Sequence, residues 1–430
     1  MNGEYVVRRE RVLDAIHPGV LLASAGTQAG YGSVADPFRQ DSDFFYLTGF
    51  DEPDAVLVLV SGETRRSVIF LRPRDVERER WEGERLGVER AVERMGLDEA
   101  YPISELDSRL PGLFENTARL FYRLGNDRRL DDRVLDAVNA VRAKARQSVW
   151  WPSSIVEPSE VTGELRLVKS EGEIRLIQRA ADLSAVGHRA VMRAARAGMG
   201  EHELEAILLA TFRAGGARRA AYPSIVGSGS NATVLHYVAN DCALRTGDLV
   251  LVDAGCEYQH YAADITRTFP VDGRFSEAQA QIYDLVLAAQ VAAIDRVRVG
   301  ATMEDLHAVA VRVLTEGLVD LGLVVGPVSE AIEDERYKPF YMHRTGHYLG
   351  LDVHDVGRYS EQGRPRPLAA GNVVTVEPGI YIPQESDVAD EYRGIGVRIE
   401  DDVLVSADGP RTLTAAAPKV REDVEQACSR

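Results

Sequence analysis

Four carboxylates and one imidazole stand in or beside short apolar segments in the C-terminal half of this 430-residue chain. They are Asp253, Asp264, His347, Glu377 and Glu400, in the strings LVLVDAG, AADITRTFP, HRTGHYLGLDVHD, VVTVEPGIY and GVRIEDDVLV. A charged group in an apolar, strand-like segment is costly to bury unless it is paired or binds a cation. The chain must therefore fold so that groups from five separate segments come close together.

The kinds of ligand indicate which metal ions fit. One zinc ion usually takes three or four ligands rich in His or Cys, so five oxygen-rich donors are too many for it. The set suits two hard or borderline divalent cations bridged by carboxylates. Two such ions can share a water, lower its pKa, and hold both the nucleophile and a substrate oxygen. The pattern indicates a metal-dependent hydrolase.

Each segment has a plainer interpretation when it is taken alone. The two aspartates are expected at the ends of a hairpin, where an Asp often only caps a turn. Arg398 and Glu400 are two residues apart on one face of a strand, so they would equally form a buried ion pair. Asp401 and Asp402, beside that pair, are expected to be solvated.

Three of the nine histidines, His343, His347 and His354, lie within one short stretch. Gly346 and Gly350 favour a loop or bulged strand there over a helix. A lone His is more often structural than functional. Three together, with carboxylates elsewhere in the chain, favour a site.

Two other residues near the candidate ligands carry reactive side chains. His236 follows the Gly/Ser-rich loop of SIVGSGSNATVLHY and is a candidate fourth imidazole. Cys256 lies close to Asp253, and a thiol paired with His is a conceivable nucleophile. A thiol mechanism would leave the carboxylates unexplained, so we rank it below the metal site.

The composition fits a soluble globular protein, with 45% hydrophobic and 27% charged residues. No apolar run approaches the ~18 residues of a membrane span, and the N-terminus lacks an apolar core of signal-peptide length. The three cysteines form no CxxC pair or disulfide framework, so the cytoplasm is the expected compartment. A net charge of −17 gives no electrostatic attraction to nucleic acid. Neither a membrane nor a nucleic-acid partner is expected.

The pattern along the chain predicts two domains. A helix over 5–16, strands over 19–25 and in FFYLTGF, AVLVLV and SVIFLRP, and helices over about 75–145 form an α/β unit. The Pro- and Ser-containing stretch WWPSSIVEPSEVTGELRLVKS places the boundary between 1–165 and 166–430. Ser170 with Glu173 predicts a capping box for a long helix, and a second helix follows over 201–214. The pairs Ser276–Gln279 and Thr302–Asp305 predict two further caps, so the second domain reads as α+β.

Taken together, these segments resemble the aminopeptidase P branch of the pita-bread metallopeptidases. The matching strings are SIVGSGSNATVLHY, GDLVLVDAGCEYQHYAADITRTFPVDG, HYLGLDVHDVG, TVEPGIYI and YRGIGVRIEDDV. DPFRQDSDFFYLTGFDEPDAVLVLV resembles the N-terminal domain of the same branch, so the likeness runs from about residue 30 to about 415. The resemblance implies an α/β N-terminal domain followed by an α+β pita-bread catalytic domain.

The resemblance also implies a role for each ligand. Asp253 would chelate one metal ion, Asp264 and Glu400 would bridge both, and His347 and Glu377 would hold the other. The implied cofactors are two divalent cations, most often Mn²⁺, which agrees with oxygen-rich coordination. The implied substrate is a peptide with proline in second position, from which the first residue is released.

An X–Pro bond needs its own provision because its amide has no N–H and proline fixes the backbone. By resemblance, a metal-bridging hydroxide would attack the carbonyl before proline while Glu377 takes part in proton transfer. His236 and His354 would stabilise the tetrahedral intermediate or bind the scissile region. The substrate-binding residues would be His343, Tyr381 and Arg398, which line the proline pocket or orient the peptide beyond it.

Two features bear on assembly and specificity. Relatives with this N-terminal domain often form dimers or tetramers, so a homo-oligomer is expected, with Trp81 either at a contact or packed within its own domain. Many relatives carry HGxSHxLG, whereas this chain has HRTGHYLG, with Arg344 and Gly346 at the usual small positions. A reshaped or more basic pocket on the proline side is therefore expected.

Other readings of the same residues stay open. Prolidase, a dipeptidase, would use the same five ligands, and only the N-terminal match favours aminopeptidase P over it. Methionine aminopeptidase usually lacks that domain. A non-catalytic pita-bread binding module, or a metal-free creatinase-like hydrolase, is expected to have lost ligands, and none of the five is lost here.

Overall fold

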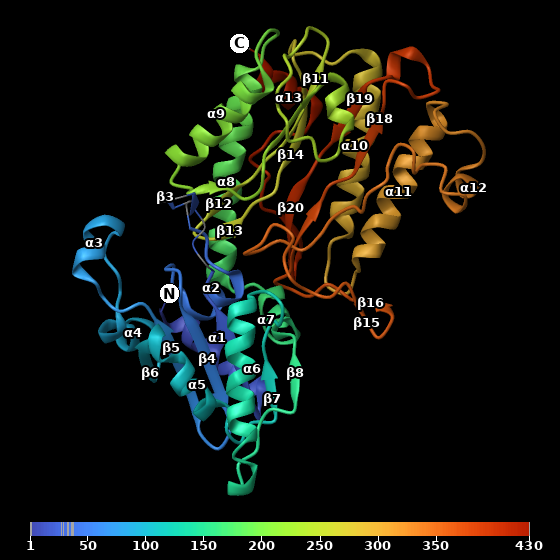
Figure 1. Ribbon diagram of the computed structural model, residues 1–430. Helices are drawn as coiled ribbons and strands as arrows, with labels where there is room; N and C mark the ends of the chain where they lie inside the picture. The colour runs from blue at the N-terminus through green and yellow to red at the C-terminus, as the bar shows by residue number, and fades with distance from the viewer. Residues whose placement is uncertain (1, 27, 29, 32–33, 36–37, 430) are drawn as a thin grey trace. The chain divides into compact units, whose positions relative to one another are not determined.

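The computed structural model describes residues 2–26, 28, 30–31, 34–35 and 38–429 (Figure 1). It divides into two compact units, Met1–Arg166 and Leu167–Arg430. The division falls inside helix α7 (Thr162–Leu167), next to the boundary expected from the sequence. Asp36 and Pro37, which open the N-terminal string quoted above, lie outside the described residues.

The first unit is built on a six-stranded mixed sheet in the order β6-β5-β4-β1-β7-β8. The central β1, β4 and β5 are antiparallel neighbours, and β6, β7 and β8 add in parallel at the two edges. The strands are β1 (Gly19–Ser24), β4 (Val56–Ser61), β5 (Arg65–Leu71), β6 (Glu99–Pro102), β7 (Arg119–Phe121) and β8 (Ser154–Val156), with a separate pair β2 (Gly30–Tyr31) and β3 (Val34–Ala35). The apolar runs predicted at 55–60 and 67–73 thus form the central strands β4 and β5.

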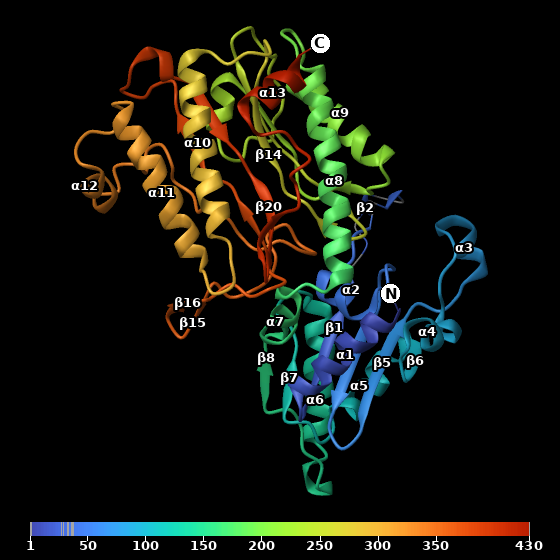
Figure 2. The same ribbon diagram turned by 180° about the vertical axis from the view of Figure 1, so that it is seen from behind.

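Helices cover both faces of this sheet, with α1 on one face and α5 and α6 on the other (Figures 1 and 2). The helices are α1 (Asn2–Ile16), α2 (Ser42–Thr48), α3 (Val76–Glu82), α4 (Val88–Met95), α5 (Leu106–Phe114) and α6 (Arg128–Arg142). Val58 and Phe70 of the sheet are fully buried in one cluster with Leu110 of α5 and Val134 of α6. Burial on both faces explains why the central strands are continuously apolar.

The prediction of a strand in FFYLTGF is wrong, because its first five residues form most of helix α2. The Asp41 side chain accepts a hydrogen bond from the Phe44 backbone N–H and caps the helix start. Gly49, with φ +63°, ends the helix in the left-handed conformation that favours glycine. All seven residues of α2 are buried, so the segment carries no helical amphipathic pattern and resembles a buried strand in sequence.

The second unit has several short antiparallel sheets in place of one long sheet. Their orders are β10-β11-β14, β13-β12-β9, β17-β20-β21, β18-β19 and β15-β16. The strands are β9 (Arg219–Ala220), β10 (Ile225–Ser228), β11 (Leu249–Asp253), β12 (Cys256–Tyr258), β13 (Tyr261–Ala262), β14 (Thr266–Pro270), β15 (Ser360–Glu361), β16 (Arg364–Pro365), β17 (Val373–Val376), β18 (Gly379–Ile382), β19 (Ile395–Arg398), β20 (Asp401–Ser406) and β21 (Gly409–Thr412). Helices combined with antiparallel strands give the α+β architecture that the sequence predicts.

The long helices pack in two pairs, α8 with α9 and α10 with α11. In both views strands β14 and β20 lie between α8 and α10 (Figures 1 and 2). The helices are α8 (Glu171–Ala194), α9 (Glu201–Ala214), α10 (Glu277–Arg296), α11 (Met303–Asp320), α12 (Val328–Glu333) and α13 (Arg421–Cys428). The structure confirms the predicted cap at the start of α8, α10 and α11, each a complete capping box. Among the described residues, no helix is both long and apolar enough to cross a membrane.

The prediction that Asp401 and Asp402 are solvated is wrong, since both are fully buried. Asp401 accepts hydrogen bonds from Arg267 (2.7 Å), Lys419 (2.7 Å) and Gln290 (2.8 Å). Burial acts to raise the pKa of Asp401, but the Arg267 and Lys419 charges outweigh it and hold that pKa well below its usual range. Arg267 also donates to four backbone carbonyls, those of residues 266, 400, 417 and 418. This buried network fixes the backbone next to Glu400.

We predict that Arg267→Met destabilises the second unit by roughly 3–5 kcal/mol, because it leaves the Asp401 charge buried without its main partner. Differential scanning calorimetry of the metal-loaded protein measures the loss. Arg274→Met is the matched control, since Arg274 pairs with Glu425 but its side chain is 81% exposed. That exposed pair contributes at most about 1 kcal/mol. Equal losses in the two variants would refute the anchoring role of Arg267.

Candidate metal centre

Two of the predicted ligands come from one three-stranded sheet. Asp253 ends β11, opposite Thr266 of β14, and Asp264 lies just before β14 begins. The connection is more elaborate than the predicted hairpin, because β12 and β13 form between them and belong to another sheet. A Cβ at Gly255 would lie 1.7 Å from the Ala263 carbonyl oxygen, so only glycine permits this close approach. The approach brings both carboxylates to one side of the sheet.

The two glutamates sit where the chain passes from one sheet to another. Glu377 separates β17 from β18, and Glu400 separates β19 from β20. Strands β17 and β20 pair in one sheet, while β18 and β19 pair in the other. Both breaks therefore lie side by side, and each one aims a carboxylate away from the strand ladders.

His347 belongs to a loop, as its flanking glycines predict. The loop is fastened to β17 by two hydrogen bonds. The Thr375 N–H donates to the His347 carbonyl (2.8 Å), and the His347 N–H donates to the Thr375 hydroxyl oxygen (3.0 Å). The Glu377 N–H also donates to the Thr345 carbonyl (2.8 Å). A Cβ at Gly346 would lie 1.9 Å from the Thr375 carbonyl oxygen, so the loop requires glycine at this position.

The structure brings the five predicted ligands together. Ligand atoms of Asp264, His347 and Glu400 all lie within 4.8 Å of one another. His347 Nε2 is 3.5 Å from Asp264 Oδ2 and 3.5 Å from Glu377 Oε1. Asp253 joins the group through the Tyr222 hydroxyl, which lies 2.7 Å from Asp253 Oδ1 and also contacts Asp264 Oδ1.

The electrostatics of the cluster fit bound cations. Burial raises the pKa of Asp253 despite the opposing Arg398 charge, and it raises the pKa of Glu377 to about 7. Burial and the neighbouring carboxylates raise the pKa of Glu400 well above its usual range. Burial acts to lower the pKa of His347, but Asp264 and Glu377 outweigh it and raise the pKa to about 9. Desolvated carboxylates that repel one another are a donor set for divalent cations.

The tautomer of His347 suits a metal ligand. Its Nδ1 lies 3.0 Å from the Tyr348 carbonyl, an acceptor, so the hydrogen-bond network assigns the proton to Nδ1. Once bound metal has displaced the second ring proton, the Nε2 lone pair would face Asp264 and Glu377. A backbone carbonyl in this role is a common way to orient a ligating imidazole.

The predicted substrate-binding residues form a hydrogen-bonded chain that starts at Asp253. Arg398 donates to Asp253 Oδ2 (2.6 Å) and to the Tyr381 hydroxyl (2.9 Å). That hydroxyl lies 2.8 Å from His343 Nε2, and His343 Nδ1 lies 2.8 Å from the Arg344 carbonyl. Because the carbonyl only accepts, His343 carries its proton on Nδ1 and the Tyr381 hydroxyl donates to Nε2. Burial and Arg398 lower the pKa of His343 to about 4, which agrees with a neutral ring.

The sequence left open a buried ion pair between Arg398 and Glu400, and the structure shows a different pairing. Arg398 pairs with Asp253, and its side chain makes no ion pair with Glu400 among the described contacts. Tyr381 is fully buried and stands behind the wall of the cavity, while Arg398 and His343 line it.

The cluster opens into a cavity of about 860 Å³, a size typical of ligand sites. His236 and His354 both line it, with the His354 ring 4.4 Å from the His347 ring, centroid to centroid. Apolar side chains make up much of the remaining wall; they are Pro223, Ile225, Leu235, Val238, Met303 and Val353. All predicted site residues except Tyr381 therefore face one cavity.

Several residues that support the ligands were missed by sequence reasoning. The Thr266 hydroxyl donates to Glu400 Oε2 (2.6 Å) and accepts from Arg398 Nε (3.1 Å). Tyr222 joins the two aspartates, as described above. His307 also lines the cavity, bonded through Nδ1 to the Thr345 hydroxyl (2.9 Å). A threonine or tyrosine beside a strand is too common to mark a site, so no sequence signal identified these residues.

A second group of potential metal ligands, Glu201, Asp241 and Cys242, serves the structure instead. Glu201 is fully buried and accepts from the Ser228 N–H and hydroxyl, both at 2.7 Å. It also accepts from the Tyr237 hydroxyl (2.8 Å) and the Cys242 N–H (2.9 Å). Both carboxylate oxygens are thus satisfied, and Glu201 anchors the two ends of the loop that carries His236.

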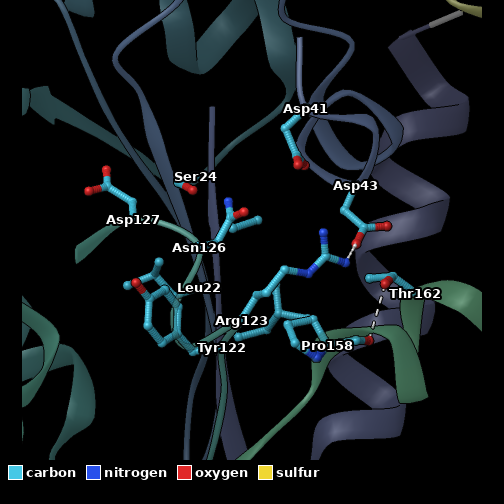
Figure 3. A pocket seen from close by; sticks show the side chains of 12 residues that line it. Leu22, Ser24, Asp41, Asp43, Tyr122, Arg123, Asn126, Asp127, Pro158 and Thr162 are labelled. Atoms are coloured by element: carbon cyan, nitrogen blue, oxygen red, sulfur yellow. Dashed lines mark hydrogen bonds and ion pairs between the residues drawn. The ribbon is translucent and has the colours of Figure 1, made fainter. Parts of the chain in front are cut away.

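A small cavity in the first unit also has acidic walls (Figure 3). Its acids already have partners, because Asp41 caps α2 and Asp127 caps α6. Asp43 pairs with Arg123 at 3.1 Å and with Arg166 at 2.8 Å. The acids of this cavity are explained by the fold of the first unit.

Comparison with known proteins supports the same assignment. The sequence model of "Metallopeptidase family M24" matches residues 175–407, and that of "Aminopeptidase P, N-terminal domain" matches residues 5–122. The chain is 45% identical to a Haemophilus influenzae protein named Xaa-Pro aminopeptidase, over 98% of this chain and 96% of the relative. It is 42% identical to an Escherichia coli protein of the same name, with the same coverage. The solved structure of the Pseudomonas aeruginosa aminopeptidase PepP superposes with a TM-score of 0.97 at 46% identity, over 100% of this chain and 98% of that one.

We predict that divalent metal stabilises the protein more at pH 8 than at pH 5. In the metal-free protein the folded pKa values of Glu377 (about 7) and His347 (about 9) exceed their ordinary 4.5 and 6.5. A raised folded pKa gives a contribution to stability that falls as pH rises, here between about 4.5 and 9. Bound metal holds both groups deprotonated and removes that loss.

Melting temperatures measured at each pH with and without a fixed free Mn²⁺ concentration test this prediction. Each tenfold gain in apparent metal affinity adds about 1.4 kcal/mol to the free energy of unfolding. A metal-induced shift that is constant or shrinks from pH 5 to pH 8 would contradict the expectation.

We predict that Gly346→Ala weakens metal binding at least ~10-fold, because the new Cβ forces the His347 loop away from β17. Isothermal titration of the metal-free protein with Mn²⁺ measures the change. Gly62→Ala is the control, since a Cβ at Gly62 meets nothing within 4 Å. Unchanged affinity in Gly346→Ala would show that the loop can shift without cost.

Proposed function

The chain belongs to metallopeptidase family M24 as an aminopeptidase P, a metallo-exopeptidase that releases the first residue of Xaa-Pro peptides, and on this premise we propose how its residues carry out the reaction. The observation that carries the proposal is the convergence of five potential ligands in one cavity that four further histidines also line.

We assign the five ligands to two divalent cations. Asp264 and Glu400 would serve both ions, Asp253 would hold one, and His347 with Glu377 would hold the other. Asp253 already accepts from Tyr222 and Arg398, but each carboxylate oxygen has a second lone pair for a metal. When bound, the two ions lower the pKa of a shared water and polarise the scissile carbonyl.

Glu377 is placed to move a proton across the scissile bond. Its Oε1 lies 3.5 Å from His347 Nε2, on the metal side, and its Oε2 lies 3.9 Å from His343 Nδ1, on the other side. A carboxylate that faces both directions can accept a proton from the attacking water and return it to the proline nitrogen as the bond breaks. That nitrogen needs a proton because an X–Pro amide has none.

Three histidines, His236, His343 and His354, are assigned to bind the reacting peptide. Burial lowers the pKa of His343 and of His354, so both rings are neutral near pH 7. We assign His354 and His236 to the carbonyl oxygen of the scissile bond, where they stabilise the developing oxyanion. We assign His343 and Arg398 to the proline side, and Tyr381 to positioning both from behind the wall.

The aminopeptidase reading is favoured over prolidase. Both curated relatives reported above carry the name Xaa-Pro aminopeptidase and match this chain from end to end. The matched N-terminal domain is of the aminopeptidase P type.

Three finer assignments complete the proposal. Mn²⁺ is the expected ion because four of the five ligands are carboxylates. The cytoplasm is the expected compartment, supported by three free cysteines. A homo-oligomer is expected, with Trp81 at a contact, because its side chain is 89% exposed. That exposure makes the alternative, packing of Trp81 within its own domain, wrong.

We predict that the metal-free protein is inactive and that Mn²⁺ restores cleavage of Xaa-Pro-Yaa tripeptides, with much slower cleavage of Xaa-Pro dipeptides. Release of the first residue, followed by chromatography, measures both rates. The reverse preference would make the protein a prolidase. Absence of metal-dependent cleavage of either substrate would refute the catalytic assignment.

In the same assay we predict that Glu377→Gln lowers kcat by about 10³-fold or more and that His354→Ala lowers it about 10²-fold. His202→Ala is the control, an exposed histidine on α9 outside the cavity. Retention of most activity by Glu377→Gln would remove the proposed proton transfer.

A further inference from the structure

Arg344 gives this cavity a cation that the catalytic assignment does not use. It lies on the cavity wall next to His343, and its side chain is exposed. Two arginines line the cavity, and the other, Arg398, is 3% exposed and paired with Asp253. Arg344 is therefore the accessible guanidinium among the described lining residues.

The backbone around Arg344 is held on both sides. The His343 ring donates to the Arg344 carbonyl, at the end of the chain of bonds that begins at Asp253. On the other side, the buried Thr345 hydroxyl bonds the Tyr341 hydroxyl (2.6 Å) and His307 Nδ1 (2.9 Å). Both anchors tie the position of Arg344 to the proposed reaction centre, so its guanidinium starts from a fixed point on the wall.

No carboxylate neutralises Arg344 within the described part of the chain. No ion pair within 4 Å involves it, although Glu304 lines the same cavity. The neighbouring His307 does not add a second charge. Burial, Arg344 and Lys338 lower the pKa of His307 to about 4, so its ring is neutral near pH 7. A single unpaired cation thus faces a cavity in a chain of net charge −17.

We propose that Arg344 binds a carboxylate on the peptide segment that follows proline, and so selects substrates that carry a negative charge there. This inference rests on the proposed function, which places proline beside His343. The charge can come from the C-terminal carboxylate of a short peptide or from an acidic side chain after proline. A planar guanidinium matches either carboxylate with two parallel hydrogen bonds.

The length of the Arg344 side chain and the spacing of residues in the peptide agree with this subsite. An extended peptide advances about 3.3–3.6 Å per residue, so the residue after proline lies one such step beyond the proline site. Arg344 is one residue along the chain from His343, and its flexible stem spans the remaining distance. The next carboxylate of the substrate therefore falls within its range.

Four substrates separate the two sources of charge. They are Ala-Pro-Leu, Ala-Pro-Leu-amide, Ala-Pro-Glu-amide and Ala-Pro-Lys-amide, each cleaved by the full-length Mn²⁺-loaded protein. For the unmodified protein we expect kcat/KM to be about 5- to 30-fold higher for Ala-Pro-Leu than for its amide, the range of a charge-assisted hydrogen bond. A similar gain of Ala-Pro-Glu-amide over Ala-Pro-Leu-amide would assign the subsite to side chains as well.

The variants are Arg344→Ala, Arg344→Lys and Arg344→Glu. Arg344→Ala is expected to reduce the preference for the charged substrates to less than twofold, and Arg344→Lys to keep part of it. Arg344→Glu is expected to prefer Ala-Pro-Lys-amide. Lys338→Ala is the matched control, because Lys338 also acts on His307 electrostatically but pairs with Glu335 and does not line the cavity.

A preference for the charged substrates that survives in Arg344→Ala would overturn the proposal. So would an equal loss in Arg344→Ala and Lys338→Ala, because it would show a diffuse field instead of a contact.

Binding of the product dipeptide gives a readout that does not need turnover. Isothermal titration of the Mn²⁺-loaded protein with Pro-Leu and with Pro-Leu-amide should show the same 5- to 30-fold difference, lost in Arg344→Ala. A protein that binds Pro-Leu through Arg344 but cleaves no Xaa-Pro peptide would refute the proposed function and retain this subsite. A protein that cleaves these peptides with no difference between Pro-Leu and its amide would keep the function and refute the subsite.

Discussion

The structure of the second unit depends on how it offsets the free-energy cost of burying several carboxylates close together. Asp253, Asp264, Glu377 and Glu400 converge as largely buried side chains on the wall of one cavity, and like charges so close together repel strongly. Hydrogen-bond donors of the protein offset part of this repulsion. Arg398 and Tyr222 donate to Asp253, and Thr266 donates to Glu400. The negative charge that these donors leave unbalanced favours bound cations. The same carboxylates therefore affect both the stability of the second unit and the chemistry of the site.

A separate, self-neutralising network lies directly behind this site. Asp401 is balanced by Arg267 and Lys419, so it keeps its charge while its neighbour Glu400 stays available. Two adjacent acids in one segment thus have opposite functions. The difference arises from which side of the strand each one faces and from which cations lie there.

The backbone around the site is fixed by close approaches that only glycine permits. Gly255 lets the chain before β14 pass beside Asp253, and Gly346 lets the His347 loop lie against β17. The loop that carries His236 is held in another way, by the buried carboxylate of Glu201. The loops that carry His236 and His347 are therefore each held in place by hydrogen bonds at their ends.

Many features of the fold could be predicted from short stretches of the sequence. The capping pairs that begin α8, α10 and α11 and the glycine-flanked His loop could be predicted, because each depends on neighbours a few residues away. The five candidate ligands were predicted from their residue types in five separate segments, and the structure brings these residues into one cavity. Local pattern failed at α2, which is buried on every side, and at Asp401 and Asp402, whose partners Arg267 and Asp264 lie more than a hundred residues away in sequence. The pairing of Arg398 with Asp253 and the support from Thr266 were decided only by tertiary structure, because these contacts join residues more than 130 apart and leave no periodic trace in the chain. Tyr222 lies 31 and 42 residues from the two aspartates that it contacts, which is also too far for a local pattern, and the exposure of Arg344 on the cavity wall depends on the fold in the same way.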